Sequence, residues 1–330
     1  MSAESGFIPP RYLQGPYTQT ILASAKIRAA GRNPMRDAAC EMIINAGDGV
    51  RLQGFFSPQS ERVPLGLVIM LHGWEGSAGS TYVLHAGRYF YELGYNVFRL
   101  NFRDHGDTHH LNEGVFYAIL LDEVFNAVAK ASNLPGGERT FLMGFSLGGN
   151  FALRIGRKCS EHPIMTLRHI VAISPVLDPS RATDAIDRSP LLRWYFLKKW
   201  RRSLALNQEL YPHLYDFRGI MELETLRAVT DALLKKYTIF KDSEEYFRGY
   251  AVTKDALKSL SIPTSIVASS DDPAIPADEF PHLVLHPSTR LFMHTFGGHN
   301  GFLYGVFKPT WYEKYATGVF AASLSLSNMV

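Results

Sequence analysis

The residue with the clearest chemical potential in this chain is a serine between two glycines, in Gly144-Phe145-Ser146-Leu147-Gly148. An apolar run, Thr140–Phe145, precedes Ser146, and a stretch with helical spacing begins at Leu147. A serine on such a sharp strand-to-helix turn is strained, and it needs small residues two positions away on each side. The turn would raise the hydroxyl above a sheet edge and direct the Leu147 N–H toward a developing oxyanion. The pattern therefore predicts a nucleophilic serine.

A tetrahedral oxyanion needs a second backbone donor, and the loop after an earlier buried strand offers one. The run Leu67–Leu71 leads into His72-Gly73-Trp74-Glu75-Gly76-Ser77, whose glycines let the backbone approach a substrate. We therefore predict that the Trp74 N–H completes the oxyanion hole. His72 itself is interpreted as a buried, hydrogen-bonded loop histidine rather than a proton-transfer group.

A serine hydroxyl becomes a good nucleophile when an imidazole takes its proton and a carboxylate orients that imidazole. Two late strands end in suitable residues: Asp271-Asp272-Pro273 after Thr264–Ala268, and Gly297-Gly298-His299 after Arg290–Phe296. The order serine, acid, histidine is the one expected for this kind of turn. We assign His299 as the general base and prefer Asp272 as the acid, because it directly precedes a Pro-x-x-Pro turn. Asp271 remains the alternative, and its other role would be to stabilise the turn.

These residues sit on an alternation of short apolar runs and longer amphipathic stretches, which predicts βα units around a mostly parallel sheet. A turn at 46–49 suits an antiparallel hairpin at the sheet edge. The predicted strands are 41–45, 52–57, 67–71, 97–102, 140–145, 169–173, 264–268 and 290–296, and the predicted helices are 82–93, 115–132 and 147–157.

The alternation breaks near Pro179, and the next strand starts only after Pro263. The intervening stretch of helical, aromatic-rich sequence is best interpreted as an inserted cap. We therefore expect an α/β core over 1–178, with an N-terminal arm at 1–40, a helical cap over 179–261, and the rest of the core over 262–330.

Composition narrows the classes of function. The 330 residues are 46% hydrophobic and 20% charged, which is typical of a globular protein. The formal net charge of +3 gives no reason to expect a nucleic-acid partner. The start of the chain lacks a signal-peptide pattern and no stretch is long enough to span a bilayer, so we expect a cytoplasmic protein without stable membrane insertion. Cys40 and Cys159 are interpreted as reduced packing residues.

With these motifs in hand, the chain resembles the α/β-hydrolases, and more narrowly the YheT-like branch with the ABHD-type esterases and lipases. Besides the segments above, Pro16-Tyr17-Thr18-Gln19-Thr20 carries the resemblance. It implies an eight-stranded sheet with a helical cap, no cofactor, and hydrolysis of carboxylic esters through an acyl-enzyme. The chain departs from the family's common pattern at Tyr17, where family members have histidine, and at Arg103-Asp104, where they have Arg-Gly. The second departure leaves the substrate preference open.

Two segments admit other interpretations. Asp104–His110 holds metal-ligand residue types, but their order does not match a two-metal signature such as H-x-H-x-D-H, so we predict a loop at the rim of the site and no metal. Within the predicted cap, Arg193–Arg202 combines five cations with four aromatics. Its aromatics would cover the pocket, or the segment would contact an anionic lipid surface peripherally.

The function predicted from the sequence is therefore hydrolysis of a small-molecule ester with an apolar acyl or alcohol part, by Ser146, His299 and Asp272. An acyltransferase would use the same three residues with an alcohol or thiol replacing water as the acceptor. A ligand-binding protein without activity is the alternative from another class, because a fold does not guarantee catalysis.

Overall fold

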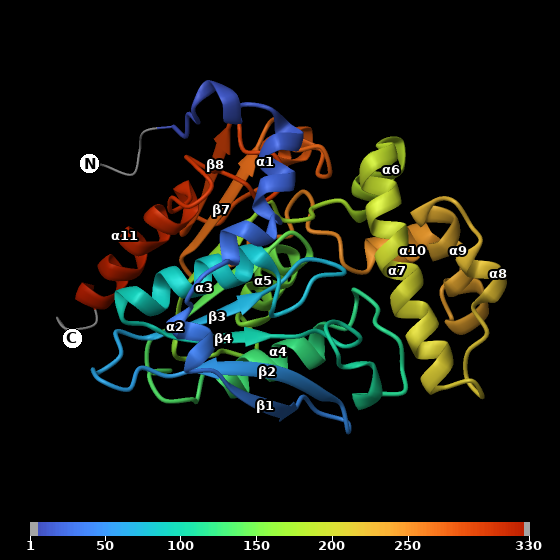
Figure 1. The fold of residues 1–330 in the computed structure, drawn as a ribbon, viewed down its shortest axis with the longest axis horizontal. Helices are drawn as coiled ribbons and strands as arrows, with labels where there is room; N and C mark the ends of the chain where they lie inside the picture. The colour runs from blue at the N-terminus through green and yellow to red at the C-terminus, as the bar shows by residue number, and fades with distance from the viewer. Residues whose placement is uncertain (1–5, 327–330) are drawn as a thin grey trace.

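The structure is a computed structural model that describes residues 6–326. Residues 1–5 of the predicted arm and 327–330 of the predicted core lie outside the described residues. Its centre is an eight-stranded sheet in the order β1-β2-β4-β3-β5-β6-β7-β8, in which β1 and β2 run antiparallel to their neighbours and β3 to β8 run parallel (Figure 1). The strands are β1 (Cys40–Asn45), β2 (Arg51–Ser57), β3 (Leu67–Leu71), β4 (Asn96–Leu100), β5 (Thr140–Phe145), β6 (Leu167–Ile173), β7 (Thr264–Ser269) and β8 (Thr289–His294).

The sheet is buried on both faces, which explains why its central strands are continuous apolar runs. Alternate residues of β3 point to opposite sides: Leu67, Ile69 and Leu71 join one hydrophobic cluster, and Val68 and Met70 join another. The first cluster includes residues of α4 (Leu121–Ala131) and α5 (Leu147–Lys158), and the second includes residues of α3 (Thr81–Leu93) and α11 (Trp311–Leu326). The predicted α/β class and the parallel core with its edge hairpin are confirmed.

One predicted helix is wrong over its first third. The helix expected at 115–132 begins only at Leu121, and residues 115–120 form a loop. Side chains from other segments accept hydrogen bonds from the backbone N–H groups of this loop and hold it in place. The acceptors are Tyr215 Oη for Val115 N at 3.3 Å, Asp104 Oδ2 for Phe116 N at 2.8 Å, and Tyr246 Oη for Ala118 N at 2.9 Å.

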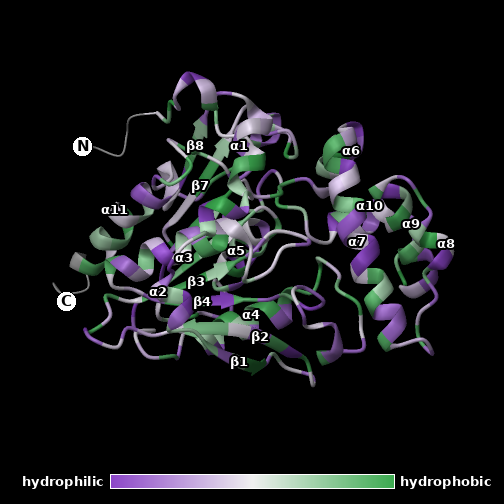
Figure 2. Cartoon of the chain, in the orientation of Figure 1, coloured by the Kyte–Doolittle hydropathy of each residue, from purple (hydrophilic) through white to green (hydrophobic). Residues whose placement is uncertain are grey.

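Five helices lie between β6 and β7 and gather together to one side of the sheet, and their sequences combine hydrophobic and hydrophilic residues (Figures 1 and 2). We call them the helical insertion. They are α6 (Pro179–Arg188), α7 (Pro190–Leu210), α8 (Arg218–Met221), α9 (Leu226–Tyr237) and α10 (Ser243–Arg248).

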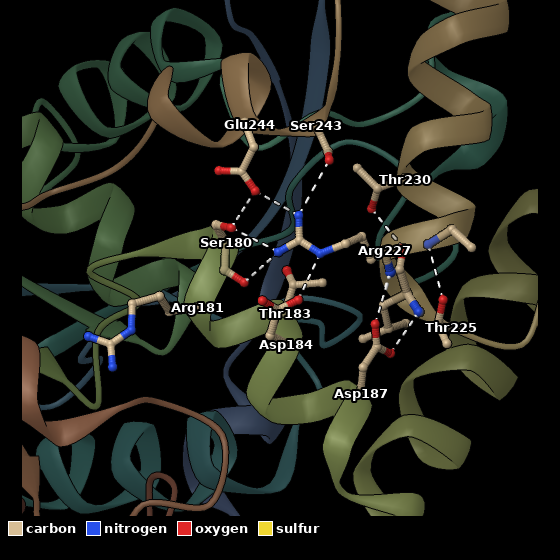
Figure 3. A network of polar contacts seen from close by, with 12 residues as sticks. Ser180, Arg181, Thr183, Asp184, Asp187, Thr225, Arg227, Thr230, Ser243 and Glu244 are labelled. Atoms are coloured by element: carbon tan, nitrogen blue, oxygen red, sulfur yellow. Dashed lines mark hydrogen bonds and ion pairs between the residues drawn. The ribbon is translucent and has the colours of Figure 1, made fainter.

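A polar network centred on Arg227 connects three helices of the insertion (Figure 3). From α9, its guanidinium donates to Asp184 Oδ1 on α6 at 2.7 Å and to Glu244 Oε1 on α10 at 2.8 Å. Asp187, at the end of α6, accepts from the first two N–H groups of α9, at 2.8 and 3.1 Å. A carboxylate at a helix N-terminus satisfies donors that have no intrahelical partner. The insertion is therefore held together by charge-assisted contacts as well as by its apolar core.

The N-terminal arm consists of short helices: η1 (Arg11–Leu13), α1 (Pro16–Ala23), η2 (Lys26–Ala29) and α2 (Pro34–Asp37). Two further 3₁₀ segments are η3 (His109–Leu111) after β4 and η4 (Ala277–His282) after β7. Within the described residues no helix is long and apolar enough to cross a membrane. Both cysteines are free; Cys159 is buried as expected, but Cys40 is exposed, so the prediction that it packs in the interior is wrong.

Candidate active site

Ser146 sits between the end of β5 and the start of α5 in a conformation that few non-glycine residues adopt, with φ 54° and ψ −117°. A Cβ on Gly144 would collide with the Gly148 carbonyl, and a Cβ on Gly148 would collide with the carbonyls of Leu71 and His72. Both glycines of the pentapeptide are therefore required by contacts within the turn and with the neighbouring loop.

Backbone hydrogen bonds hold the strained turn from both sides. The Ser146 N–H donates to Ile173 O at the end of β6, at 2.9 Å. The Ser146 carbonyl accepts from Asn150 N at 3.0 Å and from Val176 N at 3.3 Å. These bonds fix the backbone of the turn at the carboxyl edge of the sheet.

His299 and Asp272 meet at the same edge. His299 Nδ1 lies 2.9 Å from Asp272 Oδ2 and 3.2 Å from Oδ1. The carboxylate also accepts from the N–H groups of Ala274 and Ile275, at 2.8 and 3.0 Å, and its side chain is 3% exposed. A carboxylate accepts only, so Nδ1 carries the proton that is shared with Asp272 and Nε2 is left for another partner.

Asp271 occupies a different position from its neighbour. Its Oδ1 accepts from Gly298 N at 2.8 Å, so it supports the loop that carries His299 without touching the ring. Burial raises the pKa of this carboxyl, and the hydrogen bond from Gly298 opposes that rise. The geometry thus separates two acids that the sequence left as alternatives.

The loop after β3 carries the predicted oxyanion donor. A Cβ on Gly73 would lie 3.1 Å from Ser146 Cβ, so this loop runs directly beside the serine. In the described part of the chain, the N–H groups of Trp74 and Leu147 donate to no protein acceptor. Two free donors beside a nucleophile are what an oxyanion hole requires.

His72 is a buried, fully bonded residue, as predicted. Its Nδ1 lies 2.7 Å from Gly73 O and its Nε2 accepts from Phe102 N at 3.2 Å. Burial lowers the pKa of His72 well below its ordinary value, so the ring is neutral. Both ring nitrogens are engaged, which leaves none for proton transfer.

Helix α7 of the insertion packs against the loop after β3, which carries Trp74 and Glu75. Trp74 stacks on Phe196 with ring centroids 5.4 Å apart and meets Trp200 edge-on at 5.0 Å. Lys199 Nζ donates to Glu75 O at 2.6 Å. Part of the predicted aromatic segment therefore faces the site. Trp194 and Tyr195 are exposed on the same helix, and contact of that surface with lipid stays a prediction.

The sequence did not indicate that the N-terminal arm supports the histidine loop. Thr20 Oγ1 accepts from His299 N at 2.9 Å, and the buried Gln19 exchanges hydrogen bonds with Leu303, its Oε1 accepting from the N–H at 2.8 Å. The Pro16–Thr20 segment was recognised only as part of a family resemblance. A contact across almost the whole chain has no local signal, because the side chain and its partner meet only in the fold.

Replacing Thr20 with valine keeps the shape of this side chain but removes the acceptor for the His299 N–H. Loss of one such hydrogen bond costs about 1–2 kcal/mol, so we expect kcat to fall by about 5- to 30-fold with a smaller change in KM. Thr18→Val, the same change on the exposed side of α1, is the control and should leave kcat within about twofold. Equal kcat values for the two variants, measured on one ester, would contradict the supporting role.

Ser146, His299, Trp74 and Leu147 all line one cavity between the sheet edge and the helical insertion. Much of the remaining wall is apolar and comes from the insertion, including Ile186, Phe196, Trp200, Leu204, Leu226, Leu233, Leu234 and Phe247. An apolar cavity with a few convergent polar groups is the usual form of a small-molecule site.

Burial shifts the pKa values of several titratable groups on the cavity wall, among them two acids and a histidine. Desolvation raises the pKa of Glu75 to about 8 and that of Asp104 to about 7, and it lowers the pKa of His105 to about 4. At neutral pH Glu75 is therefore mostly protonated and His105 neutral. Asp104 and His105, from the loop that the sequence places at the rim of the site, line the wall of the cavity.

A metal ion would need several ligand side chains close together. Across residues 6–326, no group of three or more His, Cys, Asp or Glu side chains is arranged to hold a metal ion. His109, which a metal interpretation would use, instead hydrogen-bonds Ser203 Oγ through Nε2 at 2.8 Å.

An eight-stranded, mostly parallel sheet with a strained serine at the turn after its central strand defines an α/β-hydrolase. Residues 62–289 match the model of the serine aminopeptidase S33 family of hydrolases, and the chain belongs to this family. Its relatives also confirm the resemblance to the ABHD-type branch of the superfamily.

A protein from Dictyostelium discoideum, called abhydrolase domain-containing protein, is 24% identical over 98% of this chain and 82% of its own length. Phospholipase ABHD3 from Mus musculus is 21% identical over 72% of this chain and 59% of its own length. A putative esterase from Synechocystis is 25% identical over 90% of this chain and 87% of its own length.

Solved structures share the fold. An esterase from Pyrococcus furiosus superposes with a TM-score of 0.56 at 17% identity, covering 90% of this chain and 96% of that chain. A membrane phospholipase A, described as a bacterial virulence factor, gives 0.55 at 16% identity, covering 92% and 91%. At these identities the likeness concerns the fold. Together with the family match it makes the chain a serine-hydrolase-like member of the superfamily.

Proposed function

We propose that this protein hydrolyses carboxylic esters through an acyl-enzyme, with Ser146 as nucleophile, His299 as general base and acid, and Asp272 as the group that orients His299. The observation that carries the proposal is the pairing of His299 Nδ1 with Asp272 on the cavity that Ser146 also lines. This pairing leaves His299 Nε2 as the ring atom able to take the serine proton.

In the first half of the reaction His299 Nε2 takes the Ser146 proton while Oγ bonds to the ester carbonyl carbon. The carbonyl electrons move to oxygen, and the Trp74 and Leu147 N–H groups stabilise that charge. When the tetrahedral intermediate collapses, the bond to the alcohol oxygen breaks and the imidazolium gives its proton to the leaving alcohol. In the second half water repeats these steps on the acyl-enzyme and releases the acid.

The cavity favours an ester with an apolar part. Burying an alkyl chain against apolar walls gains about 0.8 kcal/mol per methylene, which suits the leucine, phenylalanine and tryptophan lining. Relatives called phospholipase and putative esterase support the ester class. We also propose that the helical insertion acts as a cap, because its residues form the cavity wall opposite the sheet edge.

The test is detection of the acyl-enzyme itself. With an excess of p-nitrophenyl octanoate, we expect a burst of nitrophenol close to one equivalent of protein wherever deacylation is slower than acylation, and a mass increase of one octanoyl group after acid quench. Peptide mapping should place the acyl group on Ser146.

Added methanol or ethanol separates hydrolysis from acyl transfer. A hydrolase should return mainly octanoic acid, whereas an acyltransferase should return mainly the alkyl ester at low alcohol concentration. Ester turnover with no acyl group on Ser146 under any quench condition would rule out the mechanism.

A further inference from the structure

One end of the cavity is lined by buried hydrogen-bond acceptors that have no partner among the described residues. They are Asp104 Oδ1, His105 Nε2 and Asn207 Oδ1, on residues that are 5%, 3% and 1% exposed. We call them the acceptor cluster. Buried polar atoms are nearly always hydrogen-bonded, so three together on a cavity wall indicate a place where a ligand supplies the donors.

The acceptor character of each atom follows from what its residue already does. His105 Nδ1 lies 2.6 Å from Arg103 O and must donate to it, so Nε2 presents a lone pair. Asn207 Nδ2 donates to Asp104 Oδ2 at 3.1 Å, which leaves its buried carbonyl oxygen without a partner. Asp104 Oδ2 also accepts from Phe116 N at 2.8 Å, so Oδ1 is the free oxygen of that carboxyl. It accepts a hydrogen bond in the ionised form and carries the proton in the neutral form, which the raised pKa of Asp104 also populates near neutral pH.

The cluster is rigid because α7 is bonded to the loop after β4. Ser203 Oγ lies 2.8 Å from His109 Nε2, and Tyr211 Oη donates to His109 O at 3.1 Å. With the Asn207–Asp104 bond, these contacts attach the C-terminal part of α7 and the residue after it to one loop. A preorganised set of acceptors gives specificity without an ordering cost at binding.

The position of the cluster indicates which part of an ester it contacts. In the sheet order, the loop after β4 lies on one side of β5, and the loops after β7 and β8, with Asp272 and His299, lie on the other. The leaving alcohol must be close to His299 to receive its proton. The side of the cavity with the acceptor cluster is therefore left for the acyl part.

We propose that the acceptor cluster binds a hydroxyl group carried by the acyl chain, so that hydroxylated acyl esters are the preferred substrates. This inference rests on the proposed esterase function and narrows its substrate class. A plain alkyl end would displace solvent from these acceptors without replacing its hydrogen bonds. Sites of this kind discriminate strongly against the analogue that lacks the hydroxyl.

A hydroxyl fits better than a protonated amine. A hydroxyl can both donate and accept, so it suits Asp104 in either protonation state, whereas an ammonium only donates. The cation of Lys199 already lies close enough to influence His105 and Glu75. The Tyr117 hydroxyl, which also lacks a partner on this wall, can satisfy only one of the acceptors.

The experiment compares p-nitrophenyl esters of octanoic, decanoic and dodecanoic acids with their terminally hydroxylated and terminally aminated counterparts. For the chain length that reaches the cluster, we expect kcat/KM for the hydroxyl ester to exceed that of the alkyl ester by about tenfold or more. No preference at any length, or a preference for the amine, would overturn the proposal. The second result would favour recognition of an amine, as the name of the serine aminopeptidase family suggests.

Three variants tie the preference to the cluster. Asn207→Leu and His105→Phe each remove one acceptor at similar volume and should reduce the hydroxyl-to-alkyl ratio by at least about threefold. Leu233→Val, on the apolar wall from α9, should change both esters together and preserve the ratio. The assignment would also be overturned if both cluster variants kept the melting temperature of the unaltered protein and its hydroxyl-to-alkyl ratio of kcat/KM.

A binding measurement keeps this test independent of catalysis. Ser146→Ala protein is titrated with decanoate and with terminally hydroxylated decanoate by calorimetry, and the hydroxylated acid should bind about tenfold more tightly. If no ester were turned over, the proposed function would be wrong, but this comparison would still test whether the acceptor cluster binds a hydroxyl group. Equal affinities for the two acids would contradict the proposed role of the acceptor cluster, even if the esterase mechanism were correct.

Discussion

Ser146→Ala is expected to lower kcat on p-nitrophenyl esters by about 10⁵- to 10⁶-fold and to abolish labelling by fluorophosphonates. The reason is that the Ser146 hydroxyl forms the acyl-enzyme in the proposed mechanism. Removal of the nucleophile from a comparable triad costs about 10⁶ in kcat. The oxyanion donors Trp74 and Leu147 would remain, so a residual rate above that in water should survive. The measurements are stopped-flow or long-term turnover and gel detection of a fluorescent probe.

The control for this prediction is Ser270→Ala, which removes an exposed hydroxyl just after β7. It should label and turn over like the unaltered protein, because its side chain lies outside the cavity lining. Ser146→Ala should fold normally, since the backbone bonds of the turn involve only main-chain atoms of this residue. Undiminished probe labelling of Ser146→Ala would assign the nucleophile elsewhere.

The second large effect separates the two adjacent acids. Asp272→Asn should lower kcat by about 10⁴-fold at neutral pH, because an amide nitrogen facing His299 Nδ1 stabilises the wrong tautomer of the ring. Asp271→Asn should cost tenfold or less, since the asparagine oxygen can still accept from Gly298 N. The two variants make the same chemical change at adjacent positions, so each variant is the control of the other.

The measurement is kcat on one ester across pH 6 to 9 for both variants, with circular dichroism to confirm folding. For Asp272→Asn the loss should persist over the range, because the defect is in the orientation of the imidazole. A larger loss for Asp271→Asn than for Asp272→Asn would exchange the roles assigned from the geometry.

Much of the sheet could be predicted from local pattern. β3 and β5 have the predicted bounds, and the other strand ends differ by at most two residues, because buried parallel strands are short apolar runs bounded by polar turns. The prediction of a helix over 115–132 is wrong for its first six residues. Its spacing is helical, but side chains of Asp104, Tyr215 and Tyr246, distant in sequence, accept hydrogen bonds from its N–H groups and hold it in place.

The sequence by itself determined the strand, glycine-bounded serine and helix around Ser146, because they are contiguous and their strain is local. It also predicted the order of acid and base along the chain and favoured a buried His72. Only the tertiary structure decided which aspartate meets His299, because adjacent residues on a turn point in directions that packing sets. It alone also brought Thr20 to the histidine loop and Asn207 to Asp104, since hydrogen bonds between distant segments leave no periodic trace in a sequence.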